Sequence, residues 1–264
     1  MIQQLIAMAV PRPRPGFGVL LAAAAVALAG AVLTAPARAA GEAIEIENIR
    51  IGFAVPNEPD GGNSFKVGTW TPVRIQLRAG EARFTGDMEV LAADDDGTPT
   101  SFRLPVDIPA GQSGTYTAYI RPGSREPDLG IVLYDQNRKR VLRATQGMLL
   151  KVSPRMILPE ETVVLKLGNP QGIEMINSLP GFRREEDTSQ GGLAGSDLVV
   201  IPVDPRGEMP GRWYGYDSAK AIVVDSNDPE VMSALADFRG QALVEWVKRG
   251  GHLIVSIGEN WQAV

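Results

Sequence analysis

Hydrophobic and polar residues alternate at every second position over much of residues 44–152, and this period restricts that part of the chain to β-strands. In the clearest run, residues 70–77, Val73, Ile75 and Leu77 share one face. Arg74 falls on the opposite face, which we expect to be exposed to solvent. Residues 44–55 alternate in the same way, with one irregularity near Asn48. Further strands are predicted at 86–93, 101–108, 114–120, 129–134 and 141–152.

Turn-forming residues separate these strands. Residues 56–64 (PNEPDGGNS) read as a loop, while 94–98 (DDDGT) and 109–113 (PAGQS) read as turns. About seven short strands with turns at this spacing are typical of a β-sandwich. We therefore expect an immunoglobulin-like sandwich domain over residues 40–155, although its usual cysteine pair is absent.

The pattern changes after about Pro159. Short apolar runs rich in β-branched residues occur at 162–167, 198–201, 219–224 and 253–257, and such runs suit strands that are covered on both faces in a parallel sheet. A helix is predicted between the last two, because Leu243, Trp246 and Val247 recur at helical spacing and a Gly-Gly pair follows. The sequence thus predicts an α/β domain over residues 156–264. This domain ends just after a strand, so we expect the sequence to stop inside a longer protein.

The first 39 residues have the three parts of a secretory signal peptide. Arg12 and Arg14 lie in a segment without acids, an apolar run follows at 17–33, and small residues at Ala37 and Ala39 predict cleavage after Ala39. The alternative is an uncleaved membrane anchor, because the run is close to the length that spans a bilayer. We expect an exported protein of the periplasm or cell envelope.

Charge and cysteine content exclude several classes of function. The chain carries a formal net charge of -5 and has no basic stripe, which argues against nucleic acid as a partner. It has no cysteine, so disulfides, thiolate nucleophiles, cysteine zinc sites and lipobox anchors are all ruled out. We expect no cofactor and no metal site.

Four features invite a chemical interpretation and favour a structural one. His252 is the single histidine of the chain. Ser256 lies four residues further along the same strand, more than about 10 Å away at about 3.3 Å per residue, so the two side chains cannot form a hydrogen-bonded catalytic pair. The consecutive acids of Asp94–Asp96 do not follow the alternate ligand spacing of a calcium loop. Residues 57–63 (NEPDGGN) form a polar loop that either binds a partner or only connects strands. Residues 168–172 lack the pattern of a phosphate-binding loop.

The least ordinary segment is 209–217 (MPGRWYGYD). Its aromatic residues cluster between glycines, beside an arginine. Such a cluster either forms an interaction surface or packs against the end of a sheet. The candidate interaction residues are Arg212, Trp213, Tyr214 and Tyr216.

Three motifs carry a resemblance to a known group. Residues 68–73 (GTWTPV), 212–217 (RWYGYD) and 245–255 (EWVKRGGHLIV) resemble segments of uncharacterised bacterial envelope proteins. In that group a signal peptide and a β-sandwich precede a domain similar to the class I glutamine amidotransferase-like fold. The resemblance also implies a membrane segment further along the full-length protein. Enzymes of that fold use a cysteine nucleophile, which this chain lacks, so no catalytic residue is carried over.

These observations leave three functions open. The first is a non-enzymatic envelope protein that acts as a binding or scaffold module for an unidentified protein or ligand. The second is an amidotransferase-like hydrolase or transferase with unconventional catalytic residues, or with residues beyond 264. The third is a carbohydrate- or peptide-binding module that uses the aromatic segment. Membrane attachment, in any of these, would come from an uncleaved leader or from a later helix.

Overall fold

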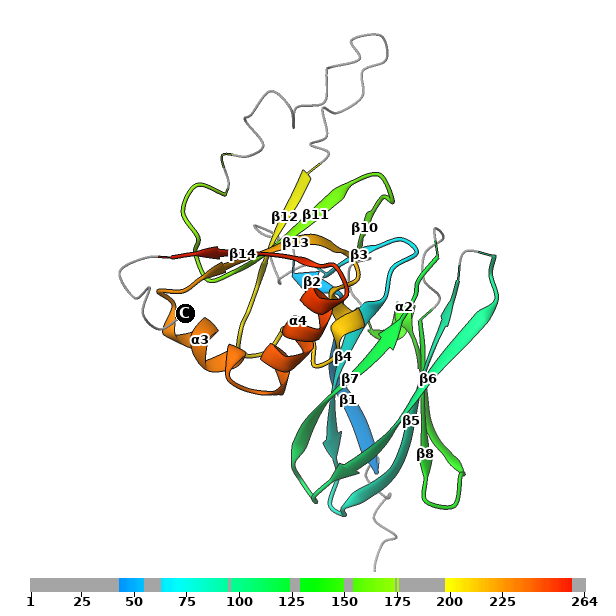
Figure 1. Ribbon diagram of the computed structural model, residues 1–264. Coiled ribbons are helices and arrows are strands. Elements are labelled where there is room, and N and C mark those ends of the chain that lie inside the picture. Colours follow the sequence, from blue (N-terminus) through cyan, green and yellow to red (C-terminus); the bar gives the residue numbers. More distant parts are fainter. Residues whose placement is uncertain are drawn as a thin grey trace, which may run out of the picture. The chain divides into compact units, whose positions relative to one another are not determined.

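The alternating segments form two antiparallel sheets in the computed structural model of the chain, with strand orders β1-β4-β7 and β6-β5-β8-β9 (Figure 1). Alternation dictates this arrangement, because each sheet turns its apolar face towards the other. We call these strands the antiparallel region. Their bounds are β1 Ile44–Ile51, β4 Thr71–Ala79, β5 Phe84–Ala93, β6 Pro99–Ile108, β7 Ser113–Ile120, β8 Gly130–Asp135 and β9 Arg140–Thr145.

The structure describes residues 43–54, 63–94, 96–123, 129–149, 154–173, 175 and 198–257. The predicted leader with its cleavage site at Ala39, most of the predicted loop at 57–63 and residues 258–264 lie outside this set. Glu42–Val264 form one compact unit.

One hydrophobic core joins the two antiparallel sheets. Val73, Ile75 and Leu77 of β4 are fully buried in it, together with Met88 of β5 and Ile131 of β8. This confirms the predicted inward face of residues 70–77. The irregularity near Asn48 is confirmed as well, since the pairing of β1 with β4 shifts register between Ile46 and Asn48.

Two predicted boundaries in this region are wrong. The loop predicted at 56–64 extends too far, because β3 begins at Asn63 (Asn63–Lys66). The strand predicted over 141–152 ends at Thr145, and the short helix α2 (Gln146–Leu149) follows. Gly147 lies in this turn of helix, and a glycine inside a strand weakens it. The turn at 94–98 is confirmed by the bond from Gly97 N to Asp94 O at 3.0 Å.

A small sheet that the sequence did not predict contains β2 (Phe53–Ala54), β3 and β10 (Arg155–Ile157), in the order β10-β3-β2. It connects parts of the chain that are far apart in sequence, since β10 runs parallel to β3. The Lys66 Nζ donates to the carbonyl oxygen of Glu161 at 2.6 Å. Phe53 belongs to the core of the region that follows β10.

The four later strands form a parallel sheet in the order β12-β11-β13-β14. Their bounds are β11 Thr162–Leu167, β12 Leu198–Val203, β13 Ala219–Asp225 and β14 His252–Ser256. The four predicted apolar runs therefore become the four strands of one parallel sheet. We call these strands and their helices the parallel region.

Two helices, α3 (Pro229–Leu235) and α4 (Phe238–Lys248), lie on one face of the parallel sheet (Figure 1). Helix α4 is the predicted one: Leu243 and Trp246 are buried, and Gly250 ends it with φ of 100°. Helix α3 was missed. Its start is encoded locally, because the Asp228 carboxylate accepts from two backbone N–H groups of the first turn and proline follows it.

The last strand, β14, differs from expectation. We predicted strands covered on both faces, but Leu253 and Ile254 of β14 are 37 % and 53 % exposed. β14 is an edge strand that pairs only with β13 among the described strands. The described chain thus contains two antiparallel sheets, a small mixed sheet and one parallel sheet with helices. Within it, no helix is both long and apolar enough to cross a membrane.

Candidate functional site

Arg74 of β4 joins the antiparallel region to the parallel region. Its Nη1 donates to the carbonyl oxygen of Glu208 at 2.7 Å, and its Nη2 donates to the carbonyl oxygen of Gly52 at 2.6 Å. The expectation that Arg74 is wet is wrong: the residue is 8 % exposed, because the segment before β13 covers this face of the sheet. Burial lowers the pKa of Arg74, and the nearby Glu208 carboxylate opposes that shift. Arg50 forms an ion pair with that carboxylate at 2.8 Å.

An aromatic cluster forms the second contact between these regions. The Tyr214 ring lies against Trp70, with centroids 5.6 Å apart, and edge-on against Tyr119 at 4.8 Å. The backbone N–H of Trp70 donates to the Asp217 carboxylate at 3.1 Å. Gly215 permits this packing, because a Cβ there would lie 2.8 Å from the Tyr119 ring. The 3₁₀ helix η3 (Trp213–Tyr216) is therefore held on β4 and β7.

The structure divides the four predicted interaction residues into two pairs. Tyr216 is 1 % exposed and packs near Trp246 in the core of the parallel region, so it belongs to no surface. Burial raises the pKa of Tyr216. Tyr214 is used in packing against the antiparallel region. Arg212 and Trp213 line an open groove instead. The segment therefore packs against the antiparallel region with one pair of residues and lines the groove with the other.

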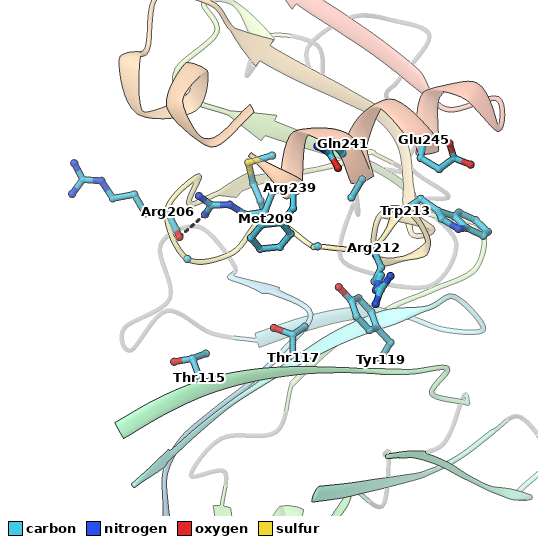
Figure 2. A pocket seen from close by; sticks show the side chains of 14 residues that line it. Thr115, Thr117, Tyr119, Arg206, Met209, Arg212, Trp213, Arg239, Gln241 and Glu245 are labelled. Carbon is cyan, nitrogen blue, oxygen red and sulfur yellow. Dashed lines mark hydrogen bonds between the residues drawn. The ribbon is translucent and has the colours of Figure 1, made fainter. Parts of the chain in front are cut away.

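This groove has a volume of about 1110 Å³ and lies between one face of a strand and one face of a helix (Figure 2). On β7, Thr115, Thr117 and Tyr119 line it at every second residue, as side chains on one face of a strand must. Arg239 of α4 lines it, and four further residues of α4 recur at i, i+3, i+4 and i+7, which is one face of a helix. These are Phe238, Gln241, Ala242 and Glu245. The segment from Arg206 to Trp213 completes the lining.

Most charged side chains of the groove already have partners. Arg239 donates to the Asp237 carboxylate and to the carbonyl oxygens of Pro205 and Arg206, at 2.8 and 2.7 Å. Arg206 pairs with Glu230. Glu245 pairs with Arg249 at 2.9 Å, four residues along α4.

Arg212 differs from these residues. It is exposed, it lines the groove, and its side chain forms no hydrogen bond or ion pair with the described residues. Figure 2 shows its side chain directed towards Tyr119. Among the described residues, Arg212 is therefore the one charged residue of the lining whose charge is not compensated by a partner.

Tyr119 forms the polar end of the strand face. Burial raises its pKa to about 12, and backbone hydrogen bonds from Gly211 and Arg212 oppose that shift. The phenol therefore stays protonated at neutral pH, although Arg212 is close by. It acts as a hydrogen-bonding group and not as a base.

The other sequence candidates lie apart from the groove. His252 is exposed at the start of β14. The carboxylates of Asp94 and Asp96 accept from the backbone N–H of Thr98, which fits the predicted hairpin turn. Gly168 has φ of 77° and lies against Asp225 and Asp228, where a Cβ would be 3.0–3.1 Å from them. The described residues contain no cluster of three or more His, Cys, Asp or Glu able to hold a metal.

Several residues of the site were missed from the sequence. The stripe of Phe238, Gln241 and Glu245 was detectable, because it recurs at helical spacing opposite the predicted apolar face. For Thr115 and Thr117 the sequence offered one signal, the alternation of residues along a strand, which places them on one face. No feature of the neighbouring sequence distinguishes Arg74 from an arginine on a solvent-exposed face of a strand.

Comparisons with known proteins add little to this geometry. A family model described as a domain of unknown function (DUF8726) matches residues 58–148, most of the antiparallel region. No curated protein matches the chain. Among solved structures, a Niemann-Pick type C2 protein from the Japanese carpenter ant is similar at 12 % identity and a TM-score of 0.26. That match covers 39 % of this chain and 89 % of the ant protein.

Proposed function

We propose that this chain is an exported, non-catalytic protein of the cell envelope that acts as a binding or scaffold module. In this proposal the antiparallel region is an immunoglobulin-like sandwich. The parallel region is similar in fold to the class I glutamine amidotransferases, and residues 1–39 direct export.

The observation that carries the proposal is the groove with Arg212. Its lining includes hydroxyl, amide, aromatic and guanidinium groups, which recognise ligands through hydrogen bonds, packing and charge. The charged side chains of Arg239 and Glu245 already form ion pairs with neighbouring residues, and these pairs stabilise the lining of the groove. Among the charged residues of this lining, Arg212 alone has no ion-pair partner in the described chain, so its charge is free to bind a ligand.

The amidotransferase-like enzyme remains the second candidate. It needs a nucleophile and a base in contact, and the single histidine of the chain lies on β14 and not among the groove residues. The geometry of the groove therefore favours binding over covalent catalysis.

Photo-crosslinking in living bacteria tests this proposal. The full chain is produced with a benzophenone amino acid in place of Gln241, which lines the groove, or in place of Arg140, an exposed residue of β9. We expect the mature protein to begin at Ala40 in the exported fraction, and a discrete adduct to form only from position 241. A cytosolic protein that retains Met1, or identical adducts from both positions, would contradict the proposal.

A further inference from the structure

We propose that the groove binds an extended peptide segment in which an acidic side chain neighbours an apolar one. This inference rests on the proposed binding function and names its ligand class. Its first support is Arg212, whose guanidinium has no hydrogen-bond or ion-pair partner in the described part of the chain. A planar guanidinium recognises a carboxylate through two parallel hydrogen bonds, and such charge-assisted bonds are about twice as strong as neutral ones.

The second support is an apolar side chain close to that charge. Phe238 is 63 % exposed, although it is a large aromatic residue. It lies against the backbone next to Arg212, because a Cβ on Gly211 would be only 2.6 Å from its ring. A ligand that reaches the guanidinium therefore meets an exposed apolar surface about one residue away.

The third support is the spacing of the polar groups along the strand wall. Thr115 and Thr117 lie two residues apart on β7, about 6–7 Å, which is also the repeat of an extended peptide. From Thr115 to Tyr119 the wall is about 13 Å long at about 3.3 Å per residue. The helix face from Phe238 to Glu245 is about 10 Å long at about 1.5 Å per residue. The groove thus has the length of three or four extended residues.

The same geometry disfavours an acidic oligosaccharide. Sugar rings bind by stacking on open aromatic faces, and Trp213 has one face covered by Arg249, whose Cζ lies 4.3 Å from the ring centroid. Phe238 is 63 % exposed, although the Arg239 Cζ lies 6.0 Å from its ring centroid, and its free surface suits one apolar side chain.

The test is a titration of the nitrogen-15-labelled mature chain, followed by the shifts of backbone amide signals. The probes are the capped peptides Gly-Leu-Asp-Leu-Gly and Gly-Leu-Asn-Leu-Gly, and trigalacturonate as the acidic sugar. We expect the Asp peptide to shift the signals of residues 211–213, 115–117 and 238–245 in a saturable way. The Asn peptide should bind at least about tenfold more weakly, because hydrogen bonds to charged groups contribute about twice as much as neutral ones.

Three variants separate the contributions. Arg212→Gln should weaken the Asp peptide about tenfold to hundredfold and leave the Asn peptide unchanged. Phe238→Ala should weaken both peptides about equally. Arg140→Gln, which removes an exposed arginine of β9, should change neither affinity.

Equal binding of the Asp and Asn peptides, unchanged affinity in Arg212→Gln, or the absence of saturable shifts would overturn the inference. Saturation of the groove by trigalacturonate in place of the peptides would also overturn it. The proposed function would survive each of these results, since compartment and groove-specific crosslinking test it separately.

Discussion

Replacement of Arg74 by methionine is expected to lower the free energy of unfolding by about 3 kcal/mol, measured by urea denaturation. The change leaves the buried carbonyl oxygens of Glu208 and Gly52 without their donor. Each unsatisfied buried group costs about 1–3 kcal/mol. The buried Arg74 Nε has no partner, so its removal offsets part of that cost.

The matched control is Arg78→Met, four residues along the same face of β4. Arg78 is half exposed, and among the described residues its side chain forms only long ion pairs, at 4.0 Å with Glu45 and 3.5 Å with Glu47. Exposed pairs of this kind contribute about 0–1 kcal/mol. If the two variants were equally stable, Arg74 would be an ordinary surface arginine and not a link between the two regions.

Gly52→Ala is expected to destabilise the protein by more than about 3 kcal/mol, since overpacking against backbone adds to a strained φ. Gly52 lies between β1 and β2 with φ of 68°, and a Cβ there would lie 1.7 Å from the carbonyl oxygen of Ser64. That oxygen belongs to the backbone of β3, so relief of the clash would separate the strands. The Gly52 carbonyl is also an acceptor for Arg74, so the same variant disturbs the link between the regions.

Gly97→Ala isolates the contribution of the φ angle. Gly97 has φ of 82° in the turn between β5 and β6, and no described residue other than its chain neighbours has an atom within 4 Å of a Cβ placed there. Alanine should cost only about 1–2 kcal/mol at this position. Equal losses of stability in the two variants, measured under the same conditions, would show that the approach to Ser64 is not tight.

Local patterns were sufficient to predict most strands. Alternation is a property of neighbouring residues, so Val73, Ile75 and Leu77 reveal their buried face without knowledge of the partner sheet. The small sheet is different, because β3 has four residues and pairs with β10 about ninety positions later. No local pattern encodes such a pairing. Helix α3, by contrast, was predictable from Asp228 and Pro229, and its signal was overlooked.

The candidate site could be predicted only in part. The segment around Arg212 was recognisable from its composition, but not the division of its aromatic residues between core and groove. That division depends on Trp70, directly before β4, and on Tyr119 of β7, which both contact Tyr214 from more than ninety residues away in sequence. The burial of Arg74 could not be predicted for the same reason. An arginine on the polar face of an alternating strand is exposed to solvent unless a part of the chain that is distant in sequence covers it.

We expect the antiparallel and parallel regions to unfold as one unit, because Arg74 and the aromatic cluster around Tyr214 hold them together and thereby shape the groove. Differential scanning calorimetry of the mature chain tests it most directly. We expect a single transition whose calorimetric and van't Hoff enthalpies agree. Two separate transitions, with the lower one unaffected by Arg74→Met, would contradict it.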